Sequence, residues 1–144
     1  MTQHNDSENL EAVKAFFLAL EQHDKDGLVP LLAPEVVEIV PFSNKGTPEP
    51  FAEYKGREAV LGYLGGGIID NFTRTVLVDK QFYVSDDGNA VFAEAKGDLI
   101  QGHTSVPYNN VYIFKFIFEG GKIIHISEYA NPITFAKLVG LPVG

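Results

Sequence analysis

The chain has 144 residues, of which 45% are apolar and 21% are charged, a composition typical of one soluble globular domain spanning 1–144. Its net charge of −8 and its thinly spread Lys and Arg residues argue against a nucleic-acid-binding surface, which needs clustered basic side chains. Because cysteine is absent, disulfides, thiolate catalysis and cysteine-ligated metal sites are excluded.

The N-terminal part predicts two helices. Apolar residues recur at helical spacing after the polar start MTQHNDSE, namely Leu10, Val13, Phe17 and Leu20. Asp6 or Ser7 can cap this helix, which should end near His23. Asp26 can cap a short second helix, and the dipeptide Ala33-Pro34 should end it, because the residue before a proline disfavours helical backbone.

The next part predicts a strand, a loop and a third helix. Val36–Val40 has the apolar character of a strand, which Pro41 stops. The stretch 43–50 contains two prolines and a glycine, so we expect a loop. A third helix should begin at Gly56 and stop at the triple glycine 65–67.

From residue 72 onward the apolar period changes to two, which is typical of strands. We expect strands at 72–84, 90–100, 108–119 and 122–129, and a last short helix at 132–139. The pairs Asp87-Gly88 and Gly120-Gly121 are hairpin-turn signals. Helices followed by a long meander indicate the α+β class. Because long strands bend readily, we expect a strongly curved antiparallel sheet wrapped around the N-terminal helices, a cone-shaped α+β barrel with an open mouth.

Alternation along the last two strands predicts which side chains face the inside of the cone. In 108–119 the inward set is Tyr108, Asn110, Tyr112, Phe114 and Phe116. In 122–129 it is Ile124, Ile126 and Glu128. Lys115 and His125 mark the opposite faces, which should meet solvent or a second subunit.

Glu128 is the candidate catalytic residue. An ionised carboxylate among aromatic side chains is costly unless it is paired, and desolvation raises its pKa toward the range useful for proton transfer. The alternative is a carboxylate at the mouth that pairs with Arg57 or caps the helix at Pro132. Asn110 and Tyr112 lie on the neighbouring strand and can hold a substrate oxygen.

These substrate-binding candidates have structural alternatives. Asn110 can instead satisfy backbone groups at a strand bend, while Tyr108 and Tyr112 can simply line the core. Glu38 has the parity of Val40 and can face the pocket. The side chains expected to line the pocket and exclude water are Phe92, Phe114, Phe116 and Ile126.

Two charged features also have two interpretations. Arg57 can clamp an acidic ligand or pair with a nearby carboxylate. Glu94 and Lys96 share a parity with Phe92; they form either an inward ion pair or, as we favour, an outer solvated pair. Four scattered histidines without ligand spacing predict no metal site, and no phosphate-binding or dinucleotide motif predicts a cofactor.

Three short segments carry a resemblance to a known family: Tyr108-Asn109-Asn110-x-Tyr112, Gly121-Lys122-Ile123 and Glu128-Tyr129-x-Asn131-Pro132. They resemble the end of SnoaL-like polyketide cyclases and of the phenazine-biosynthesis A/B proteins. Both belong to the nuclear-transport-factor-two-like superfamily, also called cystatin-like or ketosteroid-isomerase-like. The order of the first elements and the segment Lys55-Gly56-Arg57-Glu58 fit the same plan, so the resemblance covers nearly the whole chain.

The resemblance implies a deep apolar pocket, a homodimer, no cofactor, and an acid/base carboxylate from the last strand, a place that Glu128 matches. The chain departs from the steroid isomerases at two points. Val40-Pro41 stands where they have an aspartate before a proline, and Phe16 and Phe17 stand where their first helix carries a tyrosine. These departures argue against steroid isomerisation by the familiar mechanism.

We therefore expect an isomerase, cyclase or dehydratase that moves protons next to the carbonyl group of an apolar substrate, without a cofactor. The alternative is a non-catalytic protein that binds a hydrophobic ligand. The expected partners are a small apolar molecule and a second copy of the chain, which would cover the outer sheet face, and neither nucleic acid nor membrane. The polar start and the absence of an apolar run of about 20 residues predict a cytoplasmic protein.

Overall fold

The computed structural model describes the backbone of residues 2–144 and the side chains from residue 8 onward. Its helical elements are α1 (Thr2–Glu21), α2 (Lys25–Leu28), the 3-10 turn η1 (Val29–Leu31), α3 (Arg57–Leu61), the π-helical segment η2 (Gly62–Ile69) and α4 (Pro132–Val139). Its strands are β1 (Leu32–Val40), β2 (Ala52–Lys55), β3 (Phe72–Val84), β4 (Ala90–Gln101), β5 (Pro107–Tyr108), β6 (Val111–Glu119) and β7 (Lys122–Ala130). Of these described helices, none has the length and apolarity needed to cross a membrane.

The helix ends differ from the expected ones for local reasons. Asp6 and Ser7, the expected caps of α1, lie among residues whose side chains are outside the described part. Asp24 rather than Asp26 caps α2, because its Oδ1 accepts a hydrogen bond from the Gly27 backbone N–H at 3.0 Å. The triple glycine 65–67 does not stop the helix that begins with α3. The chain continues through it in wide π-type turns to Ile69.

Two strand predictions need correction. Ala33-Pro34 lies inside β1, at an irregularity in its pairing with β7 between Leu32 and Val37, where a proline is tolerated. The expected strand 108–119 is divided into β5 and β6, because the backbone leaves the ladder at Asn109 and Asn110. The sequence does not predict β2, since four residues are too few to show alternation.

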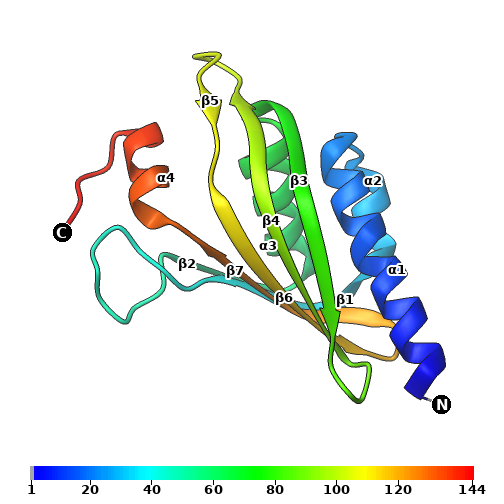
Figure 1. Cartoon of the computed structure of the whole chain (residues 1–144). Helices are drawn as coiled ribbons and strands as arrows, with labels where there is room; N and C mark the ends of the chain where they lie inside the picture. Colours follow the sequence, from blue (N-terminus) through cyan, green and yellow to red (C-terminus); the bar gives the residue numbers. More distant parts are fainter. Residues whose placement is uncertain (1) are drawn as a thin grey trace.

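The sheet is mixed rather than wholly antiparallel. Its strand order is β2-β1-β7-β6-β4-β3, with β5 paired to β4 (Figure 1). Every pair is antiparallel except β1–β7, which is parallel. This strongly curled sheet forms a half-barrel, so the α+β class and the cone-shaped architecture are confirmed.

The parallel pair β1–β7 decides what faces the cone interior. Glu38 lies opposite Ile126 in β7 and opposite Tyr54 in β2. Since residues two apart share a face, Glu128 lies on the same side of the sheet, one step beyond Ile126. The pairing therefore brings the carboxyl groups of Glu38 and Glu128 to one region of the inner face.

The narrow end of the cone is filled by phenylalanine side chains. Phe17 of α1 packs edge-to-face on Phe114 and Phe116 of β6, with ring centroids 5.2 and 5.7 Å apart. Phe16 packs in the same way on Phe116 at 5.2 Å. Such pairs bury large apolar surfaces with favourable ring geometry, so this end is a solid core. α4 stands at the end of β7, away from α1 (Figure 1).

Alternation predicted the inner face of β6 correctly, since the side chains of Tyr112, Phe114 and Phe116 are all buried. In β7 it failed only at Ile124, because a bulge opposite Ile117 and Phe118 shifts the register and turns Ile123 instead into the core.

Phe92 does not line the pocket. Its side chain is 38% exposed on the outer face, because Val91, Ala93 and Ala95 occupy the inner face of β4. Glu94 and Lys96 share that outer face and are exposed, as we expected. Lys96 Nζ lies 3.8 Å from Asp79 Oδ2 of β3.

Candidate active site

An aromatic cavity occupies the open end of the cone. Its volume is about 270 Å³. Its walls come from the β1–β2 connection, from η2, from the ends of β6 and β7, and from α4. The rings that line it include Phe51, Tyr54, Tyr63, Phe72, Tyr108 and Phe135. Of the sequence-predicted site residues, Glu128, Tyr108 and Tyr112 contribute to its wall.

Glu128 lies where this cavity meets a smaller pocket. The smaller pocket has a volume of about 40 Å³ and is lined by Glu38, Thr75 and Phe114 as well as by Glu128. Glu128 Oε1 accepts a hydrogen bond from the Tyr63 hydroxyl at 2.9 Å. The side chain is only partly buried, and the cavity is its route to solvent. A ligand in the cavity would therefore contact this carboxyl directly.

Glu38 is fully buried behind Glu128. Its side chain is 0% exposed, and no N–H or O–H group of the described residues donates to either of its carboxyl oxygens. Two neighbouring carboxyl groups that are both ionised repel each other strongly where water is excluded. The pair is therefore stable in this geometry when it shares at least one proton, as carboxyl dyads do in low-dielectric surroundings.

The surroundings favour the proton on Glu38. Burial, and then the charge of Glu128, raise the pKa of Glu38 well above its ordinary value. Burial also raises the pKa of Glu128, but the hydrogen bond it accepts from Tyr63 opposes that rise. As pH increases, Glu128 is thus the first of the two to become a carboxylate, next to the cavity.

Tyr63 is held in place as a hydrogen-bond donor. Its ring stacks on Tyr54, with centroids 4.5 Å apart and planes 13° from parallel. The π-type turn brings Gly67 against the ring, where an added Cβ would lie 3.3 Å from Tyr63 Cδ1. Burial and the neighbouring carboxyl groups raise the pKa of Tyr63 well above its usual range, so the phenol keeps its proton. The sequence gives no signal for this residue, because GYLGGGII shows neither helical nor strand period.

Asn110 does not line the cavity; its side chain joins the start of β6 to the start of α4. We call its four hydrogen bonds the Asn110 clasp. Its Oδ1 accepts from the backbone N–H groups of Val111 at 2.8 Å and Asn131 at 3.1 Å. Its Nδ2 donates to the Asn131 carbonyl at 3.1 Å and to the Tyr108 hydroxyl oxygen at 2.7 Å. The side chain thus satisfies backbone where β6 begins and α4 starts, which is the structural alternative foreseen for it.

The Asn110 clasp also determines which hydrogen bonds the Tyr108 hydroxyl can make. The hydroxyl oxygen accepts a hydrogen bond from Asn110, which opposes the rise that burial causes in the pKa of Tyr108. Among the described residues no acceptor takes the Tyr108 proton. That O–H is consequently available to an acceptor in the cavity, and the hydrogen bond from Asn110 makes it a better donor.

We predict that Asn110→Ala lowers the free energy of unfolding by about 3 kcal/mol, because the backbone groups of Val111 and Asn131 lose their hydrogen-bond partner. Urea unfolding at neutral pH measures the loss. Asn109→Ala, a change at the exposed neighbour, is the control and should cost less than about 0.5 kcal/mol. Equal losses in the two variants would show that the clasp contributes no stability.

The remaining candidates lie elsewhere. The Arg57 guanidinium contacts the Leu32 carbonyl at 3.5 Å and does not line the cavity, so it neither clamps a ligand there nor pairs with Glu128. Ile126 and Phe116 are fully buried core residues. Asn131 caps α4, accepting from Ile133 N at 2.9 Å, which is the role considered for Glu128. Over the described residues, no three His, Cys, Asp or Glu side chains gather as a metal site would require.

A curled half-barrel with an acidic pair beneath an aromatic cavity defines the class of protein: an α+β, nuclear-transport-factor-two-like fold. The sequence profile of the SnoaL-like domain matches residues 13–126, so the chain belongs to the SnoaL-like family. A related sequence, the uncharacterized protein YesE of Bacillus subtilis, is 23% identical over 134 residues, covering 90% of this chain and 86% of YesE.

Solved structures share the fold. A Bacillus subtilis protein named "putative isomerase" superposes with a TM-score of 0.81 at 21% identity, covering 96% of this chain and 97% of that one. A Xanthomonas campestris protein named "putative polyketide cyclase" has a TM-score of 0.78 at 21% identity and coverages of 94% and 98%. A phenazine biosynthesis-related protein of Pseudomonas aeruginosa has a TM-score of 0.78 at 15% identity and coverages of 99% and 92%.

Proposed function

We propose that this protein is an enzyme that moves a proton at the carbon next to a carbonyl group, in an isomerisation, cyclisation or dehydration, without a cofactor. The observation that carries the proposal is the Glu38–Glu128 pair, which has no cationic partner among the described side chains and places one carboxyl group against an aromatic cavity. The names of structural relatives, isomerase and polyketide cyclase, are consistent with that class of chemistry.

The proposed step uses three groups. The Glu128 carboxylate takes a proton from the substrate carbon, and the electron pair of the broken C–H bond forms an enolate. The Tyr108 O–H donates to the oxygen on which the negative charge develops. Glu128, now a carboxylic acid, returns the proton to a carbon of the same molecule. Glu38 keeps its own proton, so it adds no second negative charge beside the Glu128 carboxylate.

Hydrogen–deuterium exchange tests this step without knowledge of the natural substrate. Enolisable cyclic ketones of increasing size are incubated with the protein in D₂O, and loss of the α-proton signal is followed by NMR. We expect exchange above the buffer rate for at least one ketone that binds. Ketones that bind but exchange only at the buffer rate would instead support the alternative function, a non-catalytic binding protein for a hydrophobic ligand.

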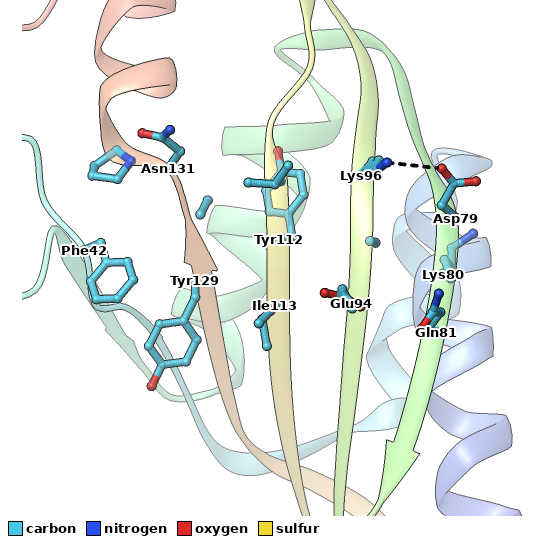
Figure 2. Close-up of a pocket in the computed structure, with 14 residues that line it drawn as sticks. Phe42, Asp79, Lys80, Gln81, Glu94, Lys96, Tyr112, Ile113, Tyr129 and Asn131 are labelled. Atoms are coloured by element: carbon cyan, nitrogen blue, oxygen red, sulfur yellow. Dashed lines mark ion pairs between the residues drawn. The ribbon is translucent and has the colours of Figure 1, made fainter.

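The outer sheet face is the proposed interface of a homodimer. A groove of about 780 Å³ lies there. Figure 2 shows Phe42 and Tyr129 on one side of it, Ile113 in the middle, and Glu94 and Lys96 on the other side. Val111 and Ile113 of this groove are 58% and 46% exposed. A second copy suits this face, since two-fold symmetry can place the Lys96 of one copy near the Glu94 of the other.

We predict that Ile113→Lys converts the dimer to a monomer, because it puts a charge into the apolar centre of the interface. Size-exclusion chromatography with light scattering measures the mass. Ile133→Lys is a matched control, since Ile133 is also 46% exposed but does not line the groove. A wild-type protein that elutes as a monomer, or a control that dissociates equally, would contradict the proposed interface.

A further inference from the structure

The cavity has a size that limits its ligand. A protein cavity of about 150 Å³ holds one benzene molecule, so by proportion about 270 Å³ holds roughly eleven non-hydrogen atoms. The smaller pocket beyond Glu128, at about 40 Å³, has room for little more than a water molecule. One or two fused rings fit such a space, and a four-ring skeleton does not.

The charges around the cavity limit the ligand further. None of the described side chains that line it is Lys, Arg or His, and its one carboxyl group, that of Glu128, has a second carboxyl group behind it. Arg57 lies outside the wall, bound to the Leu32 carbonyl. A ligand carboxylate or phosphate would thus enter an apolar space with no cation to pair with it and with a like charge beside it.

The surfaces of the cavity are suited to flat molecules. The stacked pair of Tyr54 and Tyr63 belongs to the wall. Phe72, Tyr108 and Phe135 also belong to it. The Tyr108 ring contacts those of Phe72 and Phe135, with centroids 5.9 and 6.2 Å apart. Aromatic walls favour planar guests through stacking and edge-to-face contacts.

Two polar groups remain for the ligand. Tyr108 offers an O–H that no described residue accepts, and Glu128 offers a carboxylate. From these observations we infer that the cavity binds uncharged ketones, or their enol tautomers, built on one or two flat rings, and that it rejects carboxylates and phosphates of the same shape. The inference deepens the proposed function and depends on it for the part that Glu128 plays in catalysis, but not for binding.

Three probes test the ligand class by isothermal titration at pH 7: 2-tetralone, a ketone of two fused rings; 2-naphthoate, an anion of similar shape; and a four-ring steroid ketone. We expect 2-tetralone to bind at least about ten-fold more tightly than either of the others. Equal or tighter binding of 2-naphthoate, or tighter binding of the steroid, would overturn the inference.

Two variants separate the causes. Glu128→Gln removes the negative charge, so the preference for 2-tetralone over 2-naphthoate should fall by about ten-fold. Tyr108→Phe should weaken the binding of 2-tetralone by about five-fold. It should leave the affinity for tetralin, which has the same rings without the oxygen, unchanged. Unchanged selectivity in Glu128→Gln, or equal loss of both ligands in Tyr108→Phe, would refute these assignments.

The test also keeps the two proposals apart. If 2-tetralone binds as expected but exchanges its α-protons only at the buffer rate, the ligand class stands and the catalytic function fails. If the protein exchanges protons only on large or anionic ketones, the catalytic function stands and the ligand class fails.

Discussion

Glu128→Gln is expected to reduce the rate of α-proton exchange on a bound ketone by roughly 10²–10⁴-fold, the usual loss when a general base is removed. The amide keeps the size of the side chain, and its oxygen can still accept from Tyr63, so the wall of the cavity is preserved. The amide cannot take a proton from the substrate carbon. NMR in D₂O gives the rate, and ligand titration shows in parallel that the ketone still binds.

Glu119→Gln is the matched control for this loss. Glu119 is exposed at the end of β6 and lines neither the cavity nor the outer groove, so its variant should exchange at the wild-type rate. If Glu128→Gln also keeps that rate, Glu128 is not the base and the proposed step is wrong.

The second large effect concerns stability as a function of pH. Glu38 has a raised pKa in the folded protein, whereas in the unfolded chain a glutamate titrates near pH 4.3. Between these two values the folded protein binds more protons than the unfolded chain does. The free energy of unfolding must therefore fall as pH rises above about 4.3, by up to about 1.4 kcal/mol per pH unit for one proton.

Glu38→Gln should remove this dependence, because an amide does not ionise. Its free energy of unfolding relative to wild type should rise as pH increases from 5, by at most about 1.4 kcal/mol per pH unit. Urea unfolding at four pH values gives the difference curve. A difference that does not change with pH would mean that Glu38 is not held protonated.

Other titrating groups do not imitate this signal. The carboxyl groups of Asp87 and Asp98 have lowered pKa values, because hydrogen bonds from Ser85, Asn89 and Arg74 favour their charged forms. Their contributions are lost only as pH falls below about 4, outside the window measured. Asp87, Asp98 and His125 are present in both wild type and Glu38→Gln. Their contributions to the free energy of unfolding therefore cancel in the difference between the two proteins.

Several features of the site follow from local pattern alone. Alternation along 108–119 predicts that Tyr108, Tyr112 and Phe114 face inward, and in β7 it places Ile126 and Glu128 on the inner side despite the bulge near Ile123. These predictions succeed because a strand with aromatic residues on one face and a lysine on the other can bury only one of its faces.

The rest depends on contacts that local pattern does not encode. Parity suggests that Glu38 faces the interior. Only the parallel pairing of β1 with β7 makes it the neighbour of Glu128, and the sequence of neither strand indicates which strand it pairs with or in which direction. Phe92 misleads because both faces of β4 carry apolar residues. The role of Tyr63 could not be predicted, because the glycine-rich turns that carry it have no hydrophobic period.

The β1–β7 pairing joins an early segment of the chain to one of the last. During synthesis β1 leaves the ribosome long before β7 exists, so a nascent chain that ends before residue 122 lacks the strand that pairs with β1. We expect Glu38 to be ionised at neutral pH until that strand arrives, because burial in the completed interior is what raises its pKa. Completion of the sheet then requires uptake of a proton, and its rate should decrease in alkaline solution.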